Sequence, residues 1–320
     1  MSGASLHDPA SSAWQPLVDA RPLTADVFAE TLDGGQAFRW HRQPDGSFRG
    51  AWAGHIARLR LAPDGKIEWS APATLVAEVA PALRTYLGLD RDFTALTDSL
   101  PWRSDAHLAR CLAAFPGLRI LRQPFGETLL GFLCSATKQI VQIKQMLALL
   151  AERHGSPVIE GRARTPLRAA ADESAASGVA ALPTNRLPTW PELAAMPEAD
   201  LRACLLGFRA RYIAQTARFL AAHPGWLEET ETLPYVAAKE RLCSLPGVGE
   251  KVADCVLLFG AGKLEAFPVD VWILKTMARR YGLDGWKPAH VAQFGRAHFG
   301  PLAGLAQQFL FSYERRVARA

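Results

Sequence analysis

The stretch 245–255, Leu-Pro-Gly-Val-Gly-Glu-Lys-Val-Ala-Asp-Cys, constrains the fold more than any other part of the chain. Pro246 prevents a preceding helix from continuing, and Gly247 and Gly249 can supply the positive φ or the close backbone approach of a tight turn. The turn is flanked by apolar residues. We therefore predict a helix-hairpin-helix over residues 235–260, whose second helix opens with backbone N–H groups that can hold a phosphate.

Two ionisable residues are predicted at the mouth of this hairpin. Lys251 lies in the first turn of the second helix, where the helix dipole disfavours a cation and so favours a nucleophile over a simple salt bridge. Further along the chain, Pro268 forces an extended backbone and Asp270 takes the place of a helix N-cap. Alone, Lys251 would be interpreted as a solvated lysine, and Asp270 as a helix cap with no further role. Together they predict an amine and a carboxylate at one site.

Composition limits the class of protein. A chain of 320 residues with 49% hydrophobic content can bury a core and form two domains, and a net charge of +5 weakly favours a polyanionic partner. The five scattered cysteines are typical of free thiols, and none follows Cys255, so we expect no iron–sulfur cluster. No long apolar run or secretory leader is found. We expect an intracellular protein, cytoplasmic or in the nucleoid if bacterial and nuclear if eukaryotic.

The first third of the chain is predicted to form a sheet domain. Residues 1–13 are interpreted as a disordered tail, and residues 14–115 as an antiparallel sheet with helices. From Trp14 to Trp69, apolar and polar residues alternate with period two, with Asp-Gly turns between the runs. The aromatic residues of these runs are predicted to face the core, and helical spacing begins near Pro72.

The remainder, residues 116–320, is predicted to be helical. Residues 127–153 form a buried helix or a pair of helices, whereas residues 155–188 lack periodicity and are interpreted as a loop insertion. A later helix opens with Arg209 and a second arginine, an arrangement that a phosphate backbone would stabilise. Solvated arginines or an internal ion pair are the alternatives. In the last helix, Gln307 and Phe311 stand four residues apart on one face.

Five motifs resemble a known enzyme family. They are Gly-Gly-Gln-Ala-Phe-Arg-Trp (34–40), Leu-Gly-Phe-Arg-Ala-Arg-Tyr (206–212), the hairpin, Pro268-Val-Asp270 and Ala-Gln-Gln-Phe-Leu-Phe (306–311). Their order is similar to that of the 8-oxoguanine DNA glycosylase/AP lyase family of the helix-hairpin-helix/Gly-Pro-Asp superfamily. The resemblance implies an α+β fold, in which an N-terminal antiparallel β-sheet domain (TBP-like) packs on an all-α helix-hairpin-helix glycosylase domain. We expect a monomer that binds double-stranded DNA containing oxidised guanine and no membrane.

The resemblance also implies the chemistry of the site. The enzyme would flip the damaged nucleotide out of the duplex, excise 8-oxoguanine and cleave the abasic site by β-elimination. Lys251 would attack C1′ and form a Schiff base, and Asp270 would stabilise the oxocarbenium-like transition state. The base would be bound by the Gly35 carbonyl at its N7–H, by Cys255 and Phe311 on its two faces, by Gln307 at its Watson–Crick edge and by the Pro268 carbonyl.

The DNA contacts implied by the resemblance follow the family pattern only in part. Gly247 and Gly249 would grip a phosphate, with a monovalent cation at the hairpin carbonyls and no other metal or cofactor. In other members of the family, an Asn-rich run and an arginine recognise the cytosine opposite the lesion. This chain instead has Thr137, Lys138 and Gln142 in that region. The opposite-base preference therefore stays open.

Two further aromatic positions depart from the family pattern. Phe208 replaces a tyrosine wedge, and Trp272 replaces a histidine near the 5′ phosphate. Two alternatives to the family assignment also remain. One is another glycosylase of the superfamily, specific for an alkylated or mispaired base, and the other is a non-catalytic helix-hairpin-helix DNA-binding protein.

Overall fold

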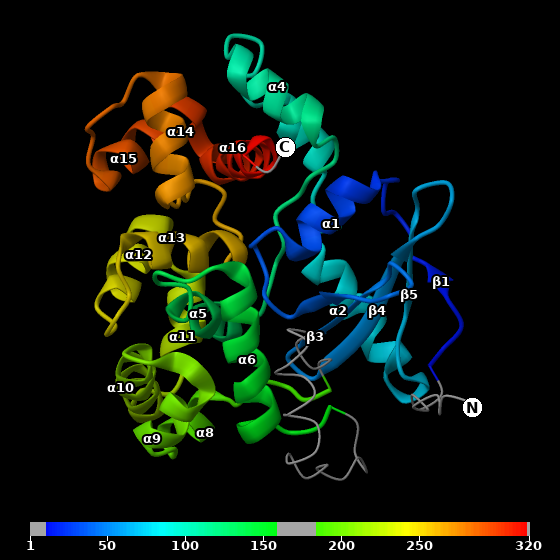
Figure 1. Ribbon diagram of the computed structural model, residues 1–320, viewed down its shortest axis with the longest axis vertical. Coiled ribbons are helices and arrows are strands. Elements are labelled where there is room, and N and C mark those ends of the chain that lie inside the picture. Colours follow the sequence, from blue (N-terminus) through cyan, green and yellow to red (C-terminus); the bar gives the residue numbers. More distant parts are fainter. Residues whose placement is uncertain (1–10, 159–183, 319–320) are drawn as a thin grey trace.

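The computed structural model describes residues 11–158 and 184–318, and within them the fold is α+β, as predicted. The N-terminal domain contains a five-stranded antiparallel sheet in the order β1-β5-β4-β3-β2 (Figure 1). Its strands are β1 (Gln15–Pro16), β2 (Trp40–Arg42), β3 (Phe48–Trp52), β4 (His55–Leu61) and β5 (Ile67–Ser70). Two Asp-Gly turns connect β2 to β3 and β4 to β5, as the sequence predicts.

One face of the sheet carries the aromatic residues and is covered by helices. Helices α1 (Ala25–Asp33) and α2 (Val76–Tyr86) pack on this face, where the rings of Phe28 and Phe48 lie 5.4 Å apart between centroids. Trp40 is fully buried opposite Gly50, and a Cβ atom at Gly50 would overlap the indole ring. The prediction that these aromatic residues face the core is therefore confirmed.

Two segments of the N-terminal domain differ from the sequence prediction. Helix α1 interrupts the region interpreted as continuous sheet, and it begins at Thr24, whose hydroxyl accepts a hydrogen bond from the N–H of Val27. At the start of the described chain, Ser12 bonds through its N–H to the carbonyl of Ala71. Residues 11 and 12 are thus tied to the chain directly after β5, which offers backbone partners, whereas residues 1–10 of the predicted tail lie outside the described residues.

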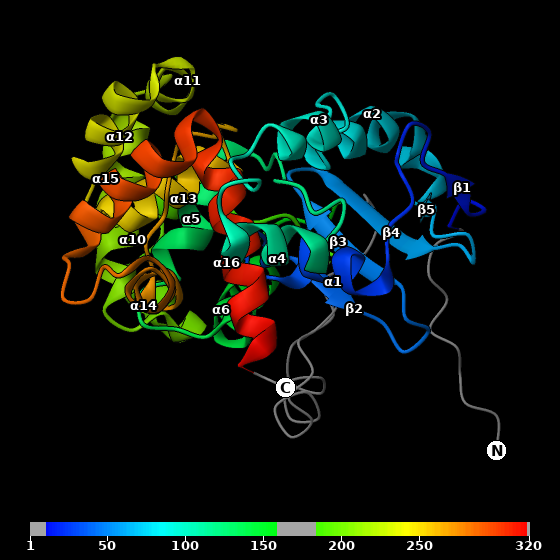
Figure 2. The same cartoon turned by 90° about the horizontal axis from the view of Figure 1, so that it is seen from above.

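The other helices form a second body beside the sheet (Figure 2). Three helical segments precede them: η1 (Ala73–Leu75), α3 (Phe93–Asp98) and α4 (Ala106–Ala114), the last of which packs on the C-terminal helix. The body itself comprises α5 (Phe125–Leu133), α6 (Ile140–His154), α8 (Trp190–Ala194), α9 (Glu198–Leu201), η2 (Arg202–Leu206), α10 (Arg209–Ala222), α11 (Trp226–Thr232), α12 (Tyr235–Cys243), α13 (Glu250–Phe259), α14 (Val271–Tyr281), α15 (Pro288–Phe299), η3 (Gly300–Leu302) and α16 (Ala303–Val317).

The region 127–153 is a pair of helices, α5 and α6, which is one of the two predicted arrangements. Of the predicted insertion 155–188, residues 159–183 lie outside the described residues. Its two ends meet, since Pro157 and Asn185 form an antiparallel bridge. Among the residues that the structure describes, no helix is long and apolar enough to cross a membrane.

Candidate active site

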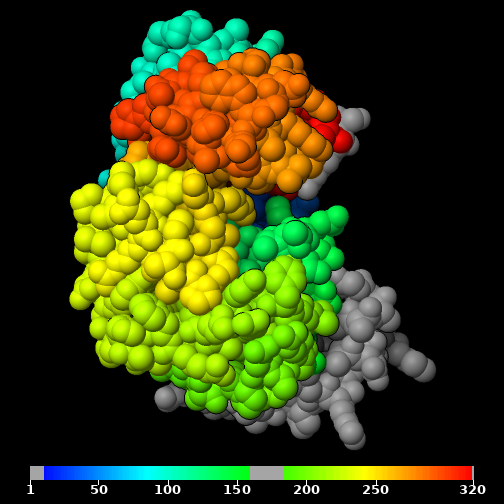
Figure 3. Space-filling model, turned by 90° about the vertical axis from the view of Figure 1, so that its left-hand side faces the viewer, coloured from blue at the N-terminus to red at the C-terminus, as the bar shows by residue number. Residues whose placement is uncertain are grey.

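A cavity of about 110 Å³ lies where the sheet domain meets the helical body. It is lined by residues from five separate segments: Gly35 and Phe38; Phe132, Ser135, Lys138, Ile140 and Ile143; Lys251, Cys255 and Phe259; Pro268 and Asp270; and Gln307, Gln308 and Phe311. The space-filling view shows a hollow between the surfaces formed by these helices, with N-terminal residues at its bottom (Figure 3). The cavity therefore brings together both predicted catalytic residues and all five predicted base-binding residues.

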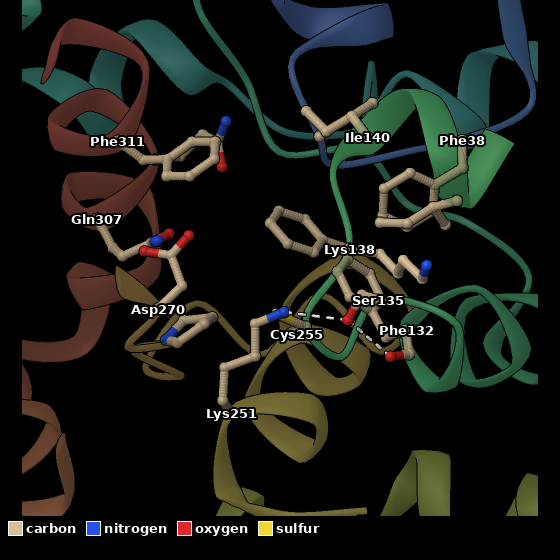
Figure 4. Close-up of a pocket in the computed structure, with 15 residues that line it drawn as sticks. Phe38, Phe132, Ser135, Lys138, Ile140, Lys251, Cys255, Asp270, Gln307 and Phe311 are labelled. Atoms are coloured by element: carbon tan, nitrogen blue, oxygen red, sulfur yellow. Dashed lines mark hydrogen bonds between the residues drawn. The ribbon is translucent and has the colours of Figure 1, made fainter. Parts of the chain in front are cut away.

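Lys251 projects into this cavity from the first turn of α13 (Figure 4). Its Nζ donates a hydrogen bond to the Ser135 hydroxyl at 3.2 Å and lies 5.3 Å from the centroid of the Phe132 ring. The Ser135 hydroxyl in turn donates to the carbonyl of Phe132 at 2.7 Å. The amine is thus held at one place in the cavity, beside the N-terminus of α13.

Asp270 lies on the side of Lys251 away from Ser135 (Figure 4). It caps α14, and its Oδ1 accepts from the N–H of Ile273 at 2.8 Å, as the sequence predicts. Burial raises the pKa of Asp270, while the cap hydrogen bond and the charge of Lys251 oppose the increase. A half-buried carboxylate beside an amine is therefore available to stabilise a developing positive charge.

Two further residues of the cavity wall, Gln307 near Asp270 and Cys255 one turn after Lys251, are uncharged (Figure 4). Gln307 is only 5% exposed, and its Oε1 is a buried acceptor that has no hydrogen-bond partner among the residues that the structure describes. Burial raises the pKa of the Cys255 thiol to about 12, although the charge of Lys251 opposes this, so Cys255 presents a neutral surface. Because a buried acceptor without a partner is unfavourable by about 1–3 kcal/mol, the Gln307 amide is poised for an external donor.

Gly35 approaches the cavity with a backbone that another residue would strain. Its φ is +107°, and a Cβ atom there would lie 3.0 Å from Ile140 Cδ1 and 3.6 Å from the Phe311 ring. The next residue, Gln36, is fully buried and binds residues 119–121 through its side chain. The glycine is therefore needed both for its conformation and for the space that it leaves open.

The hairpin has the predicted turn, with one difference between its glycines. Gly247 has φ +78°, and a Cβ atom there would lie 2.7 Å from the Tyr212 ring. Gly249 instead is extended, with φ −93°, and the space at its Cβ position is empty. No side chain of the described ranges 11–158 and 184–318 caps α13, so the N–H groups of its first turn are available in the geometry that binds a phosphate.

Arg209 makes contacts within the protein, and its predicted phosphate contact stays a prediction. Arg209 is only 3% exposed and donates to the carbonyl of Ala136 and to the hydroxyl of Thr137, the latter at 3.0 Å. Its guanidinium thus stabilises the turn before α6, a role that depends on a contact remote in sequence. Thr137 is exposed and has φ +54°, and the exposed Gln142 accepts from the N–H of Gln139.

Exposed apolar side chains surround the cavity and the hairpin. Phe208 is 53% exposed and Trp272 is 40% exposed, the latter two residues after Asp270. Others of this kind are Val141, Leu205, Tyr212 and Val271. Leu205 also has a φ of +62°, which is strained for a residue with a side chain. Because exposed apolar groups gathered at one place mark an interaction surface, this face is suited to contact unstacked bases.

Several cavity residues were not found by sequence reasoning. Ser135 and Gln308 carry no local signal, since a serine after a helix and a glutamine within one are common. Phe38 was predicted only as a core residue, yet it lines the cavity and meets Phe132 edge to face, with centroids 5.2 Å apart. Lys138 lines the cavity with an exposed side chain, whereas Thr137, Gln142, Phe208 and Trp272 do not line it.

Family models cover most of the chain. Residues 23–129 match the model of the 8-oxoguanine DNA glycosylase N-terminal domain, and residues 133–297 match the model of the HhH-GPD superfamily of base excision DNA repair proteins. The second model alone covers more than half of the 320 residues. The two models thus correspond to the sheet domain and to the helical body.

Individual relatives agree with these models. An N-glycosylase/DNA lyase of Arabidopsis thaliana is 28% identical over 97% of this chain and 82% of its own length. A probable N-glycosylase/DNA lyase of Methanothermobacter thermautotrophicus is 42% identical over 37% of each chain. The 8-oxoguanine glycosylase/lyase of Clostridium acetobutylicum, solved with double-stranded DNA that has cytosine opposite 8-oxoguanine, superimposes with a TM-score of 0.78 at 29% identity, covering 91% of this chain and 92% of that one. The chain belongs to the 8-oxoguanine DNA glycosylase family within the HhH-GPD superfamily of base excision DNA repair proteins.

Proposed function

We propose that this protein is a bifunctional DNA glycosylase and AP lyase, which removes 8-oxoguanine from double-stranded DNA and then cleaves the abasic site. The observation that carries the proposal is the meeting of Lys251, Asp270 and the unpaired Gln307 amide oxygen in one cavity. Two relatives that cover most of this chain, from Arabidopsis thaliana and Clostridium acetobutylicum, are themselves named as glycosylase/lyases. Such a cavity accepts only a base that has left the helix, so binding requires extrusion of the nucleotide.

The chemistry begins with the neutral amine of Lys251. Its lone pair forms a bond to C1′ as the bond from C1′ to N9 breaks, and the purine leaves with the bonding electrons and takes up a proton. The carboxylate of Asp270 stabilises the positive charge that develops on the sugar. Opening of the sugar ring gives a Schiff base, loss of a C2′ proton expels the 3′ phosphate, and hydrolysis returns the amine.

Recognition of the base rests on hydrogen bonds that undamaged guanine lacks. Oxidation converts N7 of guanine from an acceptor into an N–H donor, and the carbonyl of Gly35 is the acceptor that we assign to it. Gln307 would bind the Watson–Crick edge, with Cys255 and Phe311 against the two faces of the base. A wrong base would leave buried groups unpaired, at a cost of about 1–3 kcal/mol for each group.

Borohydride trapping tests the nucleophile. The protein is incubated with a duplex containing one 8-oxoguanine, and borohydride reduces the Schiff base to a stable covalent adduct. We expect an adduct with the wild-type protein and none with Lys251→Gln. The matched control is Lys263→Gln, which removes an amine from the chain after α13. An adduct that persists in Lys251→Gln would exclude Lys251 as the nucleophile.

The same assay separates the competing functions. A duplex with an alkylated purine and a duplex with a mispaired adenine are compared with the 8-oxoguanine duplex. Excision of either base at the higher rate would favour another glycosylase of the superfamily. Binding of all three duplexes without excision or adduct would indicate a non-catalytic DNA-binding protein.

The residues around Thr137 bear on the base opposite the lesion. Gln142 uses its amide oxygen within its own helix, and Arg209 is held by Ala136 and Thr137. Neither presents a charged, free donor to a cytosine, and we therefore propose a relaxed opposite-base preference. Excision rates with each of the four bases opposite 8-oxoguanine test it, and a steep preference for cytosine would contradict it.

The DNA backbone is proposed to bind at the hairpin. The uncapped N-terminus of α13 and the open space at Gly249 leave room for one phosphate. The side chains of Lys138, Phe208 and Trp272 lie on exposed positions and are assigned to DNA contacts. The monovalent cation at the hairpin carbonyls and the lack of any other cofactor stay predictions, as does the monomeric state.

A further inference from the structure

The loop that brings Gly35 into the cavity is held from two sides by residues outside the cavity. On one side, Gln36 donates from Nε2 to the carbonyl of Arg119 at 2.9 Å and accepts at Oε1 from the N–H of Leu121 at 3.0 Å. On the other side, Arg315 of α16 donates from Nη1 to the carbonyl of Gly34. The backbone before and after Gly35 is therefore anchored.

Arg315 connects this loop to the ring that lines the cavity. Its side chain is buried, with 7% exposure, and Nη1 lies 3.4 Å from Oε1 of Glu30. Its guanidinium carbon lies 4.9 Å from the centroid of the Phe311 ring, one helical turn earlier on α16. A single planar cation thus contacts the residue before Gly35, an acid of α1 and the aromatic wall.

The glycines of the loop cannot hold this geometry unaided. Gly34 ends α1 and donates from its N–H to the carbonyl of Glu30 at 2.9 Å, and a Cβ atom at Gly34 would overlap Glu30. Gly35 has a positive φ and no side chain. Because glycine torsion angles are loosely restrained, the direction of the Gly35 carbonyl depends on the groups that bind its neighbours.

We propose that Arg315 is a positioning residue for lesion recognition, which holds the Gly34–Gly35 backbone and the Phe311 ring as one rigid unit. The inference rests on the proposed function and deepens it. The Gly35 carbonyl must meet the N7–H of a base that is also stacked on Phe311, and these two contacts fit one base only if their spacing is fixed. Arg315 would not touch the substrate, since it acts through both of these residues.

This role predicts that a substitution of Arg315 impairs the steps in which the base is recognised. Cleavage at a preformed abasic site involves Lys251 and Asp270 but no base, so it needs neither Gly35 nor Phe311. Burial raises the pKa of Asp270, and the charge of Arg315 is among the influences that lower it. The informative variant is therefore Arg315→Lys, which keeps the positive charge but lacks the planar guanidinium.

Three variants test the inference in single-turnover assays on one duplex sequence. The duplex carries either 8-oxoguanine or a preformed abasic site. We expect Arg315→Lys to lower 8-oxoguanine excision by about tenfold or more, while cleavage of the abasic site changes by less than about threefold. Glu30→Gln removes the charge of one partner of Arg315 and keeps the length of that side chain. It should also lower the excision rate, by a smaller factor than Arg315→Lys.

Arg316→Lys is the matched control. Arg316 is the next residue, is exposed, donates to the carbonyl of Ala114 at 3.2 Å and lies 4.5 Å from the Phe115 centroid, so it makes the same kinds of contact away from the cavity. It should change neither reaction. In a Lys251→Gln background, Arg315→Lys should also reduce the ratio of affinities for 8-oxoguanine and guanine duplexes.

The outcomes distinguish the inference from the proposed function. If the wild-type protein does not excise 8-oxoguanine, the proposed function fails and the inference fails with it. If the wild type is active and Arg315→Lys excises at the same rate, or loses both reactions equally, the inference alone is overturned. Should Arg315→Lys melt below the assay temperature, the excision rate of Glu30→Gln decides between these outcomes.

Discussion

The amine of Lys251 donates a hydrogen bond to the hydroxyl of Ser135 over 3.2 Å. The serine belongs to the turn after α5, so the proposed nucleophile on α13 is positioned by a segment remote in sequence. Ser135 lies on the side of the amine away from Asp270 (Figure 4). The geometry of the reaction therefore depends on the packing of α5 against α13.

Ser135→Ala should slow Schiff-base formation by roughly tenfold, because the amine loses the partner that restricts its position. The rate of borohydride-trapped adduct formation measures this. Ser99→Ala is the control, since Ser99 also follows a helix and donates to a carbonyl three residues earlier, that of Leu96 at 2.8 Å. Equal rates for Ser135→Ala and the wild type would show that Lys251 needs no such support.

Asp270→Asn should reduce excision by at least about 100-fold, since a neutral amide cannot stabilise the sugar cation. The amide oxygen can still cap α14, so the fold is retained.

Burial raises the pKa of Asp270, and the folded protein therefore binds more protons than the unfolded one as this group titrates. Stability falls as pH rises through that interval, so at neutral pH the free energy of unfolding of Asp270→Asn should exceed that of the wild type. A lower value in calorimetry would contradict this.

The same pKa shift predicts the pH dependence of excision. If the ionised carboxylate is the active form, the rate should fall as pH decreases through the raised pKa of Asp270, above the usual range for a carboxyl group. Single-turnover rates measured across this range test the expectation, and the residual activity of Asp270→Asn should lack the acid limb. A wild-type rate that stays constant down to the ordinary carboxyl range would contradict it.

Gln307→Met should lower 8-oxoguanine excision by about 10- to 100-fold while raising the free energy of unfolding, because the substitution removes an unpaired buried acceptor. Single-turnover kinetics and thermal melting measure the two effects. Gln293→Met, on the exposed side of α15, serves as the control. Parallel losses of rate and stability would indicate that Gln307 is only a packing residue.

Leu205→Gly should leave the free energy of unfolding unchanged or higher, because glycine relieves about 1 kcal/mol of strain at the positive φ of this residue. Loss of the exposed side chain should weaken unstacking of the duplex, and 2-aminopurine fluorescence beside the lesion reports this. Val18→Ala, another exposed apolar residue, is the control. A marked loss of stability in Leu205→Gly would show that the side chain packs rather than binds DNA.

Local patterns predicted much of this structure. The hairpin was found from Pro246 and Gly247, the cap at Asp270 from its place after Pro268, and the sheet from alternating residues and Asp-Gly turns. Each of these features depends on interactions within a few residues. The juxtaposition of Gly35, Lys251 and Phe311 came from a family resemblance, because no local rule relates segments so far apart.

Two of the differences between the sequence analysis and the structure come from contacts between segments far apart in the chain. Arg209 was expected to meet a phosphate because its own helix disfavours it, yet its partner is the carbonyl of Ala136 on another helix pair. Helix α1 was missed because its short apolar pattern lies between two runs of strand. Ser135 was overlooked because its significance appears only when α13 brings Lys251 beside it.

The cavity is built from segments between Gly35 and Phe311, so the last of its walls is supplied by α16. During synthesis, a nascent chain that does not yet include α16 already contains Lys251 and Asp270, but neither Gln307 nor Phe311. The proposed selectivity for the damaged base thus depends on α16, a helix that is synthesised after the proposed nucleophile.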